Sequence, residues 1–152
     1  MTDHDLVAKR LAFIETCLRE LRELSRPDVL STDIREQRFV EHTLQLSVQA
    51  ALDVASHIVS EERLGEPATN RELFDRLAHA GWFAKELGDR VSNMAGFRNV
   101  LVHGYTDVDL AIVRDVLANH LGDLDEYIAA IRARLGPVRG AVAKARIESN
   151  PS

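Results

Sequence analysis

Apolar residues recur every three or four positions along most of this 152-residue chain. In the first such stretch they fall at Val7, Leu11, Ile14, Leu18 and Leu21. This spacing puts the apolar side chains on one face of an α-helix, whereas a half-buried strand requires alternation with a period of two. No stretch of the chain alternates in that way. The sequence therefore predicts an all-α fold, in which each helix buries its apolar face against the others.

Turn and capping residues divide the chain into five expected helices. They span about residues 3–24, 33–63, 69–80, 83–103 and 107–135. The last of them is expected to be capped by Thr106 or Asp107. Because a chain of this length forms one compact core, we predict an up-and-down helical bundle of four to five helices over residues 1–136. Residues 137–152 are expected to form a flexible tail.

Two earlier helix starts carry paired capping residues. Thr69 and Glu72 have the spacing of a capping box, in which each side chain accepts a backbone N–H near the other. Asp33 and Glu36 show nearly the same pattern at the start of the longest expected helix. Both pairs predict helices that begin at these residues.

Composition excludes several classes of protein. No run of about 18 apolar residues occurs, which excludes a membrane span, and the acidic N-terminus lacks the apolar core of an export signal. The single cysteine, Cys17, fits a reducing compartment and excludes both an internal disulfide and a four-cysteine zinc site. We expect a cytoplasmic protein without a metal or another cofactor.

Charge is spread unevenly along the chain. With 24 acidic and 19 basic residues the net charge is -5, which counts against a protein that coats nucleic acid over its whole surface. Residues 132–152 nevertheless carry five basic residues and one acidic residue. A tail of this kind is usually solvated, and contact with a partner or with RNA is the alternative.

Polar residues become unusual at the end of the fourth expected helix. Arg98 follows Met94 by four positions, so it lies on or beside the apolar stripe of that helix. A buried guanidinium without an anion is costly, so this position indicates an interface or a phosphate site. His103 ends the helix, and Tyr105 follows just after Gly104.

The same residues also have a purely structural explanation. A histidine in the last turn complements the helix dipole, Gly104 is an ordinary helix stop, and Tyr105 could pack against the next helix. An Arg-x4-His pair is expected about 0.6 times by chance in such a composition, whereas the pair followed by the tyrosine is expected only about 0.01 times. The complete pattern is therefore much more specific than its parts.

Other polar residues give weaker signals. Four further histidines show no paired metal-ligand spacing and are expected on the surface or in satisfied helical positions: His42, His57, His79 and His120. The acidic residues Asp123, Asp125 and Glu126 are expected on solvated helix faces or at helix ends. No glycine-rich phosphate loop occurs, so ATP hydrolysis has no support.

Arg98-x4-His103-x-Tyr105, with Asn99 directly after the arginine, resembles the motif of the HepT-like proteins of the HEPN superfamily. The resemblance covers nearly the whole domain in length, helix order and motif position. It implies the toxin of a two-gene toxin–antitoxin system, a ribonuclease with tRNA as its suggested substrate. The implied partner is a minimal nucleotidyltransferase of the MntA type, which neutralises the toxin by attaching AMP to the motif tyrosine.

Carried over to this chain, the resemblance makes Arg98 and His103 the ribonuclease residues, Tyr105 the modified residue and Asn99 a helper. It also implies a homodimer in which two motifs line one cleft. RNA supplies its own nucleophile, the 2′-hydroxyl, so such an enzyme needs no metal. The histidine would move the proton, and the arginine would stabilise the charge on the phosphate.

Two other interpretations remain open. The chain could be a non-catalytic helical module that binds a nucleotidyltransferase and helps it to hold its substrate. It could also be a plain helical dimerisation domain, in which Arg98 pairs with a carboxylate across the interface. RNA cleavage and the state of Tyr105 distinguish these interpretations from a toxin.

Overall fold

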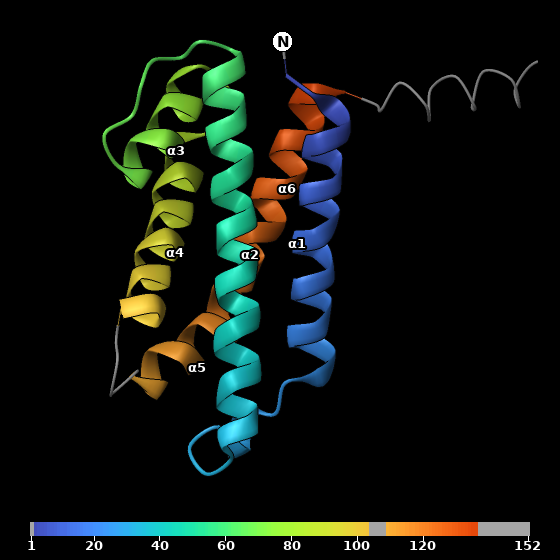
Figure 1. Cartoon of the computed structure of the whole chain (residues 1–152), viewed down its shortest axis with the longest axis vertical. Helices are drawn as coiled ribbons and strands as arrows, with labels where there is room; N and C mark the ends of the chain where they lie inside the picture. The colour runs from blue at the N-terminus through green and yellow to red at the C-terminus, as the bar shows by residue number, and fades with distance from the viewer. Residues whose placement is uncertain (1, 104–108, 137–152) are drawn as a thin grey trace, which may run out of the picture.

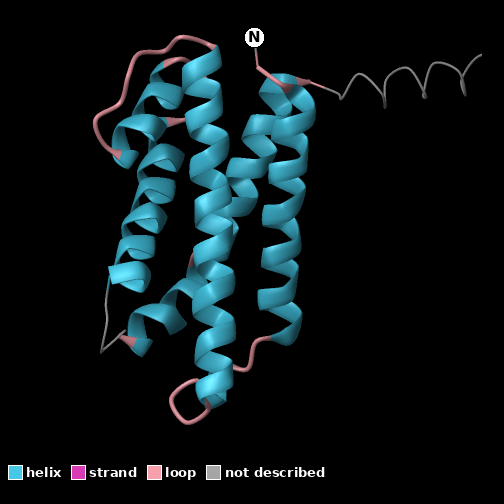
Figure 2. Cartoon of the chain, viewed as in Figure 1, coloured by secondary structure: helices cyan, strands magenta, loops and turns pink. Residues whose placement is uncertain are grey.

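The computed structural model describes residues 2–103 and 109–136, apart from the side chains of residues 99–103. Its elements are α1 (His4–Leu24), the short 3-10 helix η1 (Pro27–Val29), α2 (Ile34–Glu61), α3 (Asn70–His79), α4 (Lys85–His103), α5 (Leu110–Asn119) and α6 (Leu121–Leu135). Within these residues no strand occurs, and Figure 2 shows helices joined only by loops. The predicted all-α fold is confirmed, with six α-helices in the described part instead of four to five.

Four long helices form an antiparallel bundle (Figure 1). α1 runs from one end to the other, α2 returns beside it, α4 runs in the direction of α1, and α6 returns. The two short helices lie at opposite ends: α3 packs beside the first half of α4, and α5 crosses the end at which α4 stops. We call the end of the bundle at which α4 stops, and at which α2 and α5 begin, the motif end. The opposite end, where α1 begins and α6 stops, is the terminal end.

Tyr127 of α6 lies at the centre of the core. Its side chain is fully buried, and its hydroxyl donates to the carbonyl oxygen of Ala51 on α2 at 2.8 Å. The rings of Phe74 and Phe83 meet the Tyr127 ring edge-on, each with a centroid distance of 5.9 Å. Burial raises the pKa of the Tyr127 hydroxyl far above its usual range, so the hydroxyl stays protonated and remains a donor. This one side chain therefore ties α6 to both α2 and α3.

The start of α2 differs in part from the expected capping box. Asp33 caps the helix, because its carboxylate accepts the N–H of Arg35 at 2.9 Å. Glu36 does not complete the box. Its buried carboxylate instead accepts the backbone N–H of Arg26 at 2.5 Å. The expected pairing is wrong for Glu36 because the connection from α1 brings an N–H without a helical partner within its reach.

The capping box of α3 is confirmed. The hydroxyl of Thr69 accepts the N–H of Glu72 at 3.2 Å. The carboxylate of Glu72 accepts the N–H of Ala68 at 2.7 Å, one residue before the cap. Together the two bonds satisfy backbone donors that a helix start leaves free.

The prediction of a single helix over residues 107–135 is wrong. This segment forms two helices, α5 and α6, which are divided at His120. There φ is -121° and ψ is -3°, far from the helical ψ of about -42°. Gly122 follows the break, and glycine and histidine are both weaker helix formers than alanine. The apolar spacing continues across the break, because Leu117 and Leu121 are four residues apart, so periodicity alone gives no sign of it.

Two other helix boundaries differ from expectation. α4 begins at Lys85, so Phe83 precedes the helix, although it still packs against the core. The cap of α5 is Asp109, whose carboxylate accepts an N–H of the first turn at 2.9 Å. The expected caps were Thr106 and Asp107, which lie outside the described residues. The expectation is wrong because α5 is capped by Asp109.

Cys17 is a buried free thiol, as a packed cysteine should be. Burial raises its pKa to about 11, so the reactive thiolate is scarce at neutral pH. None of the described helices combines the length and the hydropathy that a membrane crossing requires.

Candidate active site

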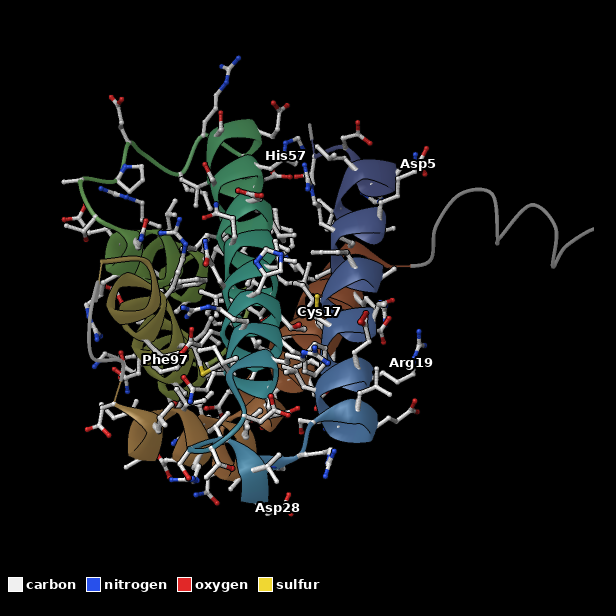
Figure 3. All side chains as sticks on the ribbon, turned by 60° about the horizontal axis from the view of Figure 1, so that its bottom comes forward. Asp5, Cys17, Arg19, Asp28, His57 and Phe97 are labelled. Atoms are coloured by element: carbon white, nitrogen blue, oxygen red, sulfur yellow. The ribbon has the colours of Figure 1, made fainter. Side chains whose placement is uncertain are left out.

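The second half of α4 presents one apolar face to the core. The buried residues of this face are Val91, Met94, Ala95 and Phe97. Arg98 comes next and is half-buried, in agreement with its expected place at the border of the apolar stripe. Figure 3 turns the motif end toward the reader and shows Phe97, the residue just before Arg98, near that end.

The guanidinium of Arg98 carries an unsatisfied donor, as do the side chains of Ser92 and Arg76. The Nε of Arg98 is shielded from solvent, and no hydrogen-bond acceptor lies within reach among the residues that the structure describes. A buried donor without an acceptor costs about 1–3 kcal/mol. Such a group is ready to bind an anion, because an anion would supply the missing acceptor.

Other arginines of the bundle are held differently. Arg132 of α6 donates through both Nη atoms to the two carboxylate oxygens of Glu15 at 2.8 and 2.5 Å. Arg90, two turns before Arg98 on α4, donates to Asp123 at 2.7 Å and also to Glu126. These pairs hold helices together, whereas Arg98 has no such pair in the described part of the chain.

His103 is the last residue of α4. It comes five positions after Arg98, which corresponds to a rise of about 7.5 Å along the helix axis. Both residues thus lie on the last two turns of one helix at the motif end. The side chains of Asn99 and His103 and the whole of Tyr105 lie outside the described residues.

The remaining histidines take the satisfied or exposed places expected of them. Nε2 of His57 accepts the backbone N–H of Asp3 at 3.1 Å. The His120 ring lies 3.0 Å from Asp115 and 3.4 Å from Asp123. His42 and His79 are exposed. Among the described residues no group of histidine, cysteine, aspartate and glutamate side chains could hold a metal ion.

The ion pairs of the acidic residues on α6 were not expected from the sequence. Asp123, predicted on a solvated face, is buried and contacts both Arg90 and His120. Asp125 pairs with Arg22 of α1, and Glu126 pairs with Arg90. These carboxylates therefore join α6 to its neighbours. No local pattern could reveal this, because Arg90 and Asp123 are 33 residues apart.

A cavity of about 810 Å³ lies at α3 and the start of α4. Its lining includes Glu72, Asp75, His79 and Lys85. α3 and the start of α4 lie in the half of the bundle away from the last turn of α4 (Figure 1). The size of a cavity therefore does not identify the motif end, and the candidate site depends on Arg98 and His103.

Comparison with known proteins gives one family and several relatives that agree with it. Residues 14–131 match the family described as "Ribonuclease HepT-like". The "mRNA nuclease HepT" of Shewanella oneidensis is 30% identical over 131 residues, which cover 86% of this chain and 98% of that protein. The "tRNA nuclease HepT" of Aphanizomenon flos-aquae is 37% identical over 118 residues, which cover 78% of this chain and 80% of that protein.

A solved structure has the same fold. It is that of the tri-AMPylated Shewanella oneidensis HEPN toxin in complex with MNT antitoxin. The TM-score is 0.80 at 30% identity, and the match covers 86% of this chain and 99% of the toxin chain. The match of residues 14–131 and the two relatives at 30% and 37% identity lead to one conclusion: this chain belongs to the Ribonuclease HepT-like family.

Proposed function

We propose that this protein is the toxin of a HepT/MntA-type (type VII) toxin–antitoxin system and that it acts as an endoribonuclease. The family and the names of its relatives support an RNA nuclease. The observation that carries the assignment of the site is the half-buried Arg98, whose Nε has no acceptor among the described residues. One relative is named for mRNA and another for tRNA, and we take tRNA as the first substrate to test.

The proposed reaction needs two groups from the motif. Arg98 pairs with the scissile phosphate and stabilises the charge that grows on it in the transition state. His103 accepts the proton of the 2′-hydroxyl or gives one to the leaving oxygen. Because the 2′-hydroxyl is the nucleophile, the reaction requires no metal ion. Asn99 helps to orient the phosphate or the histidine.

One chain provides only one motif histidine. In the proposed homodimer, two copies place their motifs along one cleft, so that the two histidines divide the roles of acid and base. The half-buried Arg98 supports this arrangement, because a second copy would cover it further.

The proposed partner is an MntA-type nucleotidyltransferase, the antitoxin. AMP attached to Tyr105 brings phosphate charge close to Arg98, where it competes with RNA for the same anion site. The solved toxin of Shewanella oneidensis is both AMPylated and bound to its antitoxin, which supports the same arrangement here. The bundle over residues 1–136 would carry all these activities, and the basic tail over residues 137–152 lies outside the described residues.

The activity is tested with purified protein that carries no AMP, incubated with total cellular RNA in the presence of a metal chelator. We expect discrete cleavage products, because neither Arg98 nor His103 depends on a metal. Gel electrophoresis and sequencing of the fragment ends measure the outcome. If a folded dimer leaves RNA intact with and without the chelator, the proposed activity is wrong and the non-catalytic module becomes the better interpretation.

The regulation is tested by co-expression with the neighbouring nucleotidyltransferase gene. We expect the intact mass to rise by one or more AMP units and RNA cleavage to be lost, because the added phosphates occupy the anion site. The Tyr105→Phe variant should keep its mass and its ribonuclease activity in the same cells. A stable complex in which Tyr105 remains unmodified would contradict this part of the proposal.

A further inference from the structure

Three arginines gather at the motif end from separate parts of the chain. Arg26 lies in the connection before η1, Arg35 in the first turn of α2, and Arg114 on α5. In Figures 1 and 3 the connection that contains Asp28, the start of α2 and α5 all lie at this end, as does the end of α4. The arginines therefore lie at the same end of the bundle as the last turn of α4.

Backbone contacts fix the positions of these arginines. Nε of Arg114 donates to the carbonyl oxygen of Pro27 at 3.5 Å and joins α5 to the connection. The N–H of Arg26 donates to Glu36 at 2.5 Å. Arg26 and Arg35 are exposed, Arg114 is half-buried, and none of the three guanidinium groups forms an ion pair within the described residues. Three guanidinium groups without an ion pair in this part of the chain thus lie at one end of the bundle, and that of Arg114 is held by a hydrogen bond.

The carboxylates of the motif end are mostly engaged. Asp33 and Asp109 cap α2 and α5, so the positive helix termini offset their charge. Asp115 is bonded to Asn119 and His120, and these bonds lower its pKa. None of these carboxylates forms an ion pair with Arg26, Arg35 or Arg114 among the described residues, so the three guanidinium groups remain available to a phosphate.

Two further carboxylates at this end, Glu23 and Asp28, are exposed. Neither of them forms an ion pair with Arg26, Arg35 or Arg114 among the described residues. The motif end therefore offers arginines without an ion pair to a phosphate, although the chain as a whole is acidic.

The surface lies close to the candidate active site along the chain. α5 begins at Leu110, seven residues after His103. Seven residues span at most about 25 Å, so an RNA strand held at Arg114 is within reach of the motif. Arginine is the side chain best suited to a phosphate, because its planar fork can donate two parallel hydrogen bonds.

We propose that Arg26, Arg35 and Arg114 form a phosphate-binding surface that holds the RNA backbone on its way to Arg98 and His103. This inference rests on the proposed ribonuclease function. The surface carries no base recognition. It positions the strand through its phosphates, as most contacts between proteins and nucleic acids do.

The test measures the binding of a fluorescent RNA oligonucleotide that is 2′-O-methylated and cannot be cleaved. Arg26→Gln, Arg35→Gln and Arg114→Gln are compared singly and combined, with the full chain in each case. We expect the combined variant to bind roughly tenfold more weakly and to lower the salt slope of log K by about two, near 0.7 for each phosphate that is no longer neutralised. On ordinary RNA it should raise KM and leave kcat unchanged.

The matched control is Arg63→Gln, an exposed arginine just after α2, at the terminal end. It should bind RNA like the unmodified sequence. Arg26→Gln and Arg35→Gln keep the test valid if Arg114→Gln disturbs the contact with Pro27. At both positions the backbone N–H, which the substitution retains, makes the hydrogen bond that holds the local structure.

Two outcomes overturn the inference. One is unchanged RNA affinity and an unchanged salt slope in the combined variant. The other is unchanged RNA binding with loss of binding to the nucleotidyltransferase, which would make the surface a protein interface. Failure of the proposed function is a separate result, since binding of the methylated RNA does not depend on cleavage.

Discussion

The His103→Ala variant is expected to lose RNA cleavage by about 100- to 10,000-fold, the usual contribution of a general acid or base. The loss should appear in kcat, because in the proposed mechanism the histidine moves a proton in the transition state and adds little to the binding of RNA. We expect the fold to be retained, because His103 is the last residue of α4. The measurement is single-turnover cleavage of a labelled tRNA, followed by thermal unfolding of the same sample.

The matched control is His42→Ala. His42 is an exposed histidine on α2, and its removal should leave kcat and the unfolding temperature unchanged. Cleavage by His103→Ala at the rate of the unmodified sequence would remove the histidine from the mechanism. The site would then have to be sought elsewhere on the protein.

The Phe74→Ala variant is expected to lower the free energy of unfolding by about 3–5 kcal/mol, the range measured for large buried aromatic residues. Phe74 is fully buried and packs edge-on against Tyr127, so its removal leaves a cavity where α3 meets α6. For a domain of this size the unfolding temperature should fall by roughly 10 °C. Denaturant titration and thermal unfolding measure both quantities.

Phe13→Ala is the same substitution at a position that is 40% exposed on α1. It should cost less than about 1 kcal/mol, because little apolar surface returns to water. Equal losses in the two variants would contradict the central place of Phe74 in the core.

Local sequence patterns predict the parts of the fold that depend on neighbouring residues. The apolar spacing of α1 and the capping pair Thr69 and Glu72 act within one or two turns, so the sequence alone locates those helices. The break at His120 does not follow from local spacing, because the apolar stripe continues through it. The contact of Glu36 with Arg26 is likewise a result of tertiary packing.

The candidate site likewise has a part that local sequence patterns predict and a part that depends on tertiary packing. Arg98 and His103 lie on one helix, so their spacing and the place of Arg98 at the edge of the core could be predicted. The surface of Arg26, Arg35 and Arg114 could not be predicted. Its members are up to 88 residues apart in the sequence, and only the packing of α5 beside the α1–α2 connection brings them together.

Helices that follow one another in the chain also pack against one another: α1 with α2, α3 with α4, and α5 with α6. Contacts of such short sequence separation favour folding within microseconds to milliseconds. The ribosome, by contrast, adds only about 5–20 residues each second. The bundle therefore closes almost as soon as α6 emerges and Arg132 can reach Glu15. An antitoxin that acts after synthesis therefore meets the folded bundle.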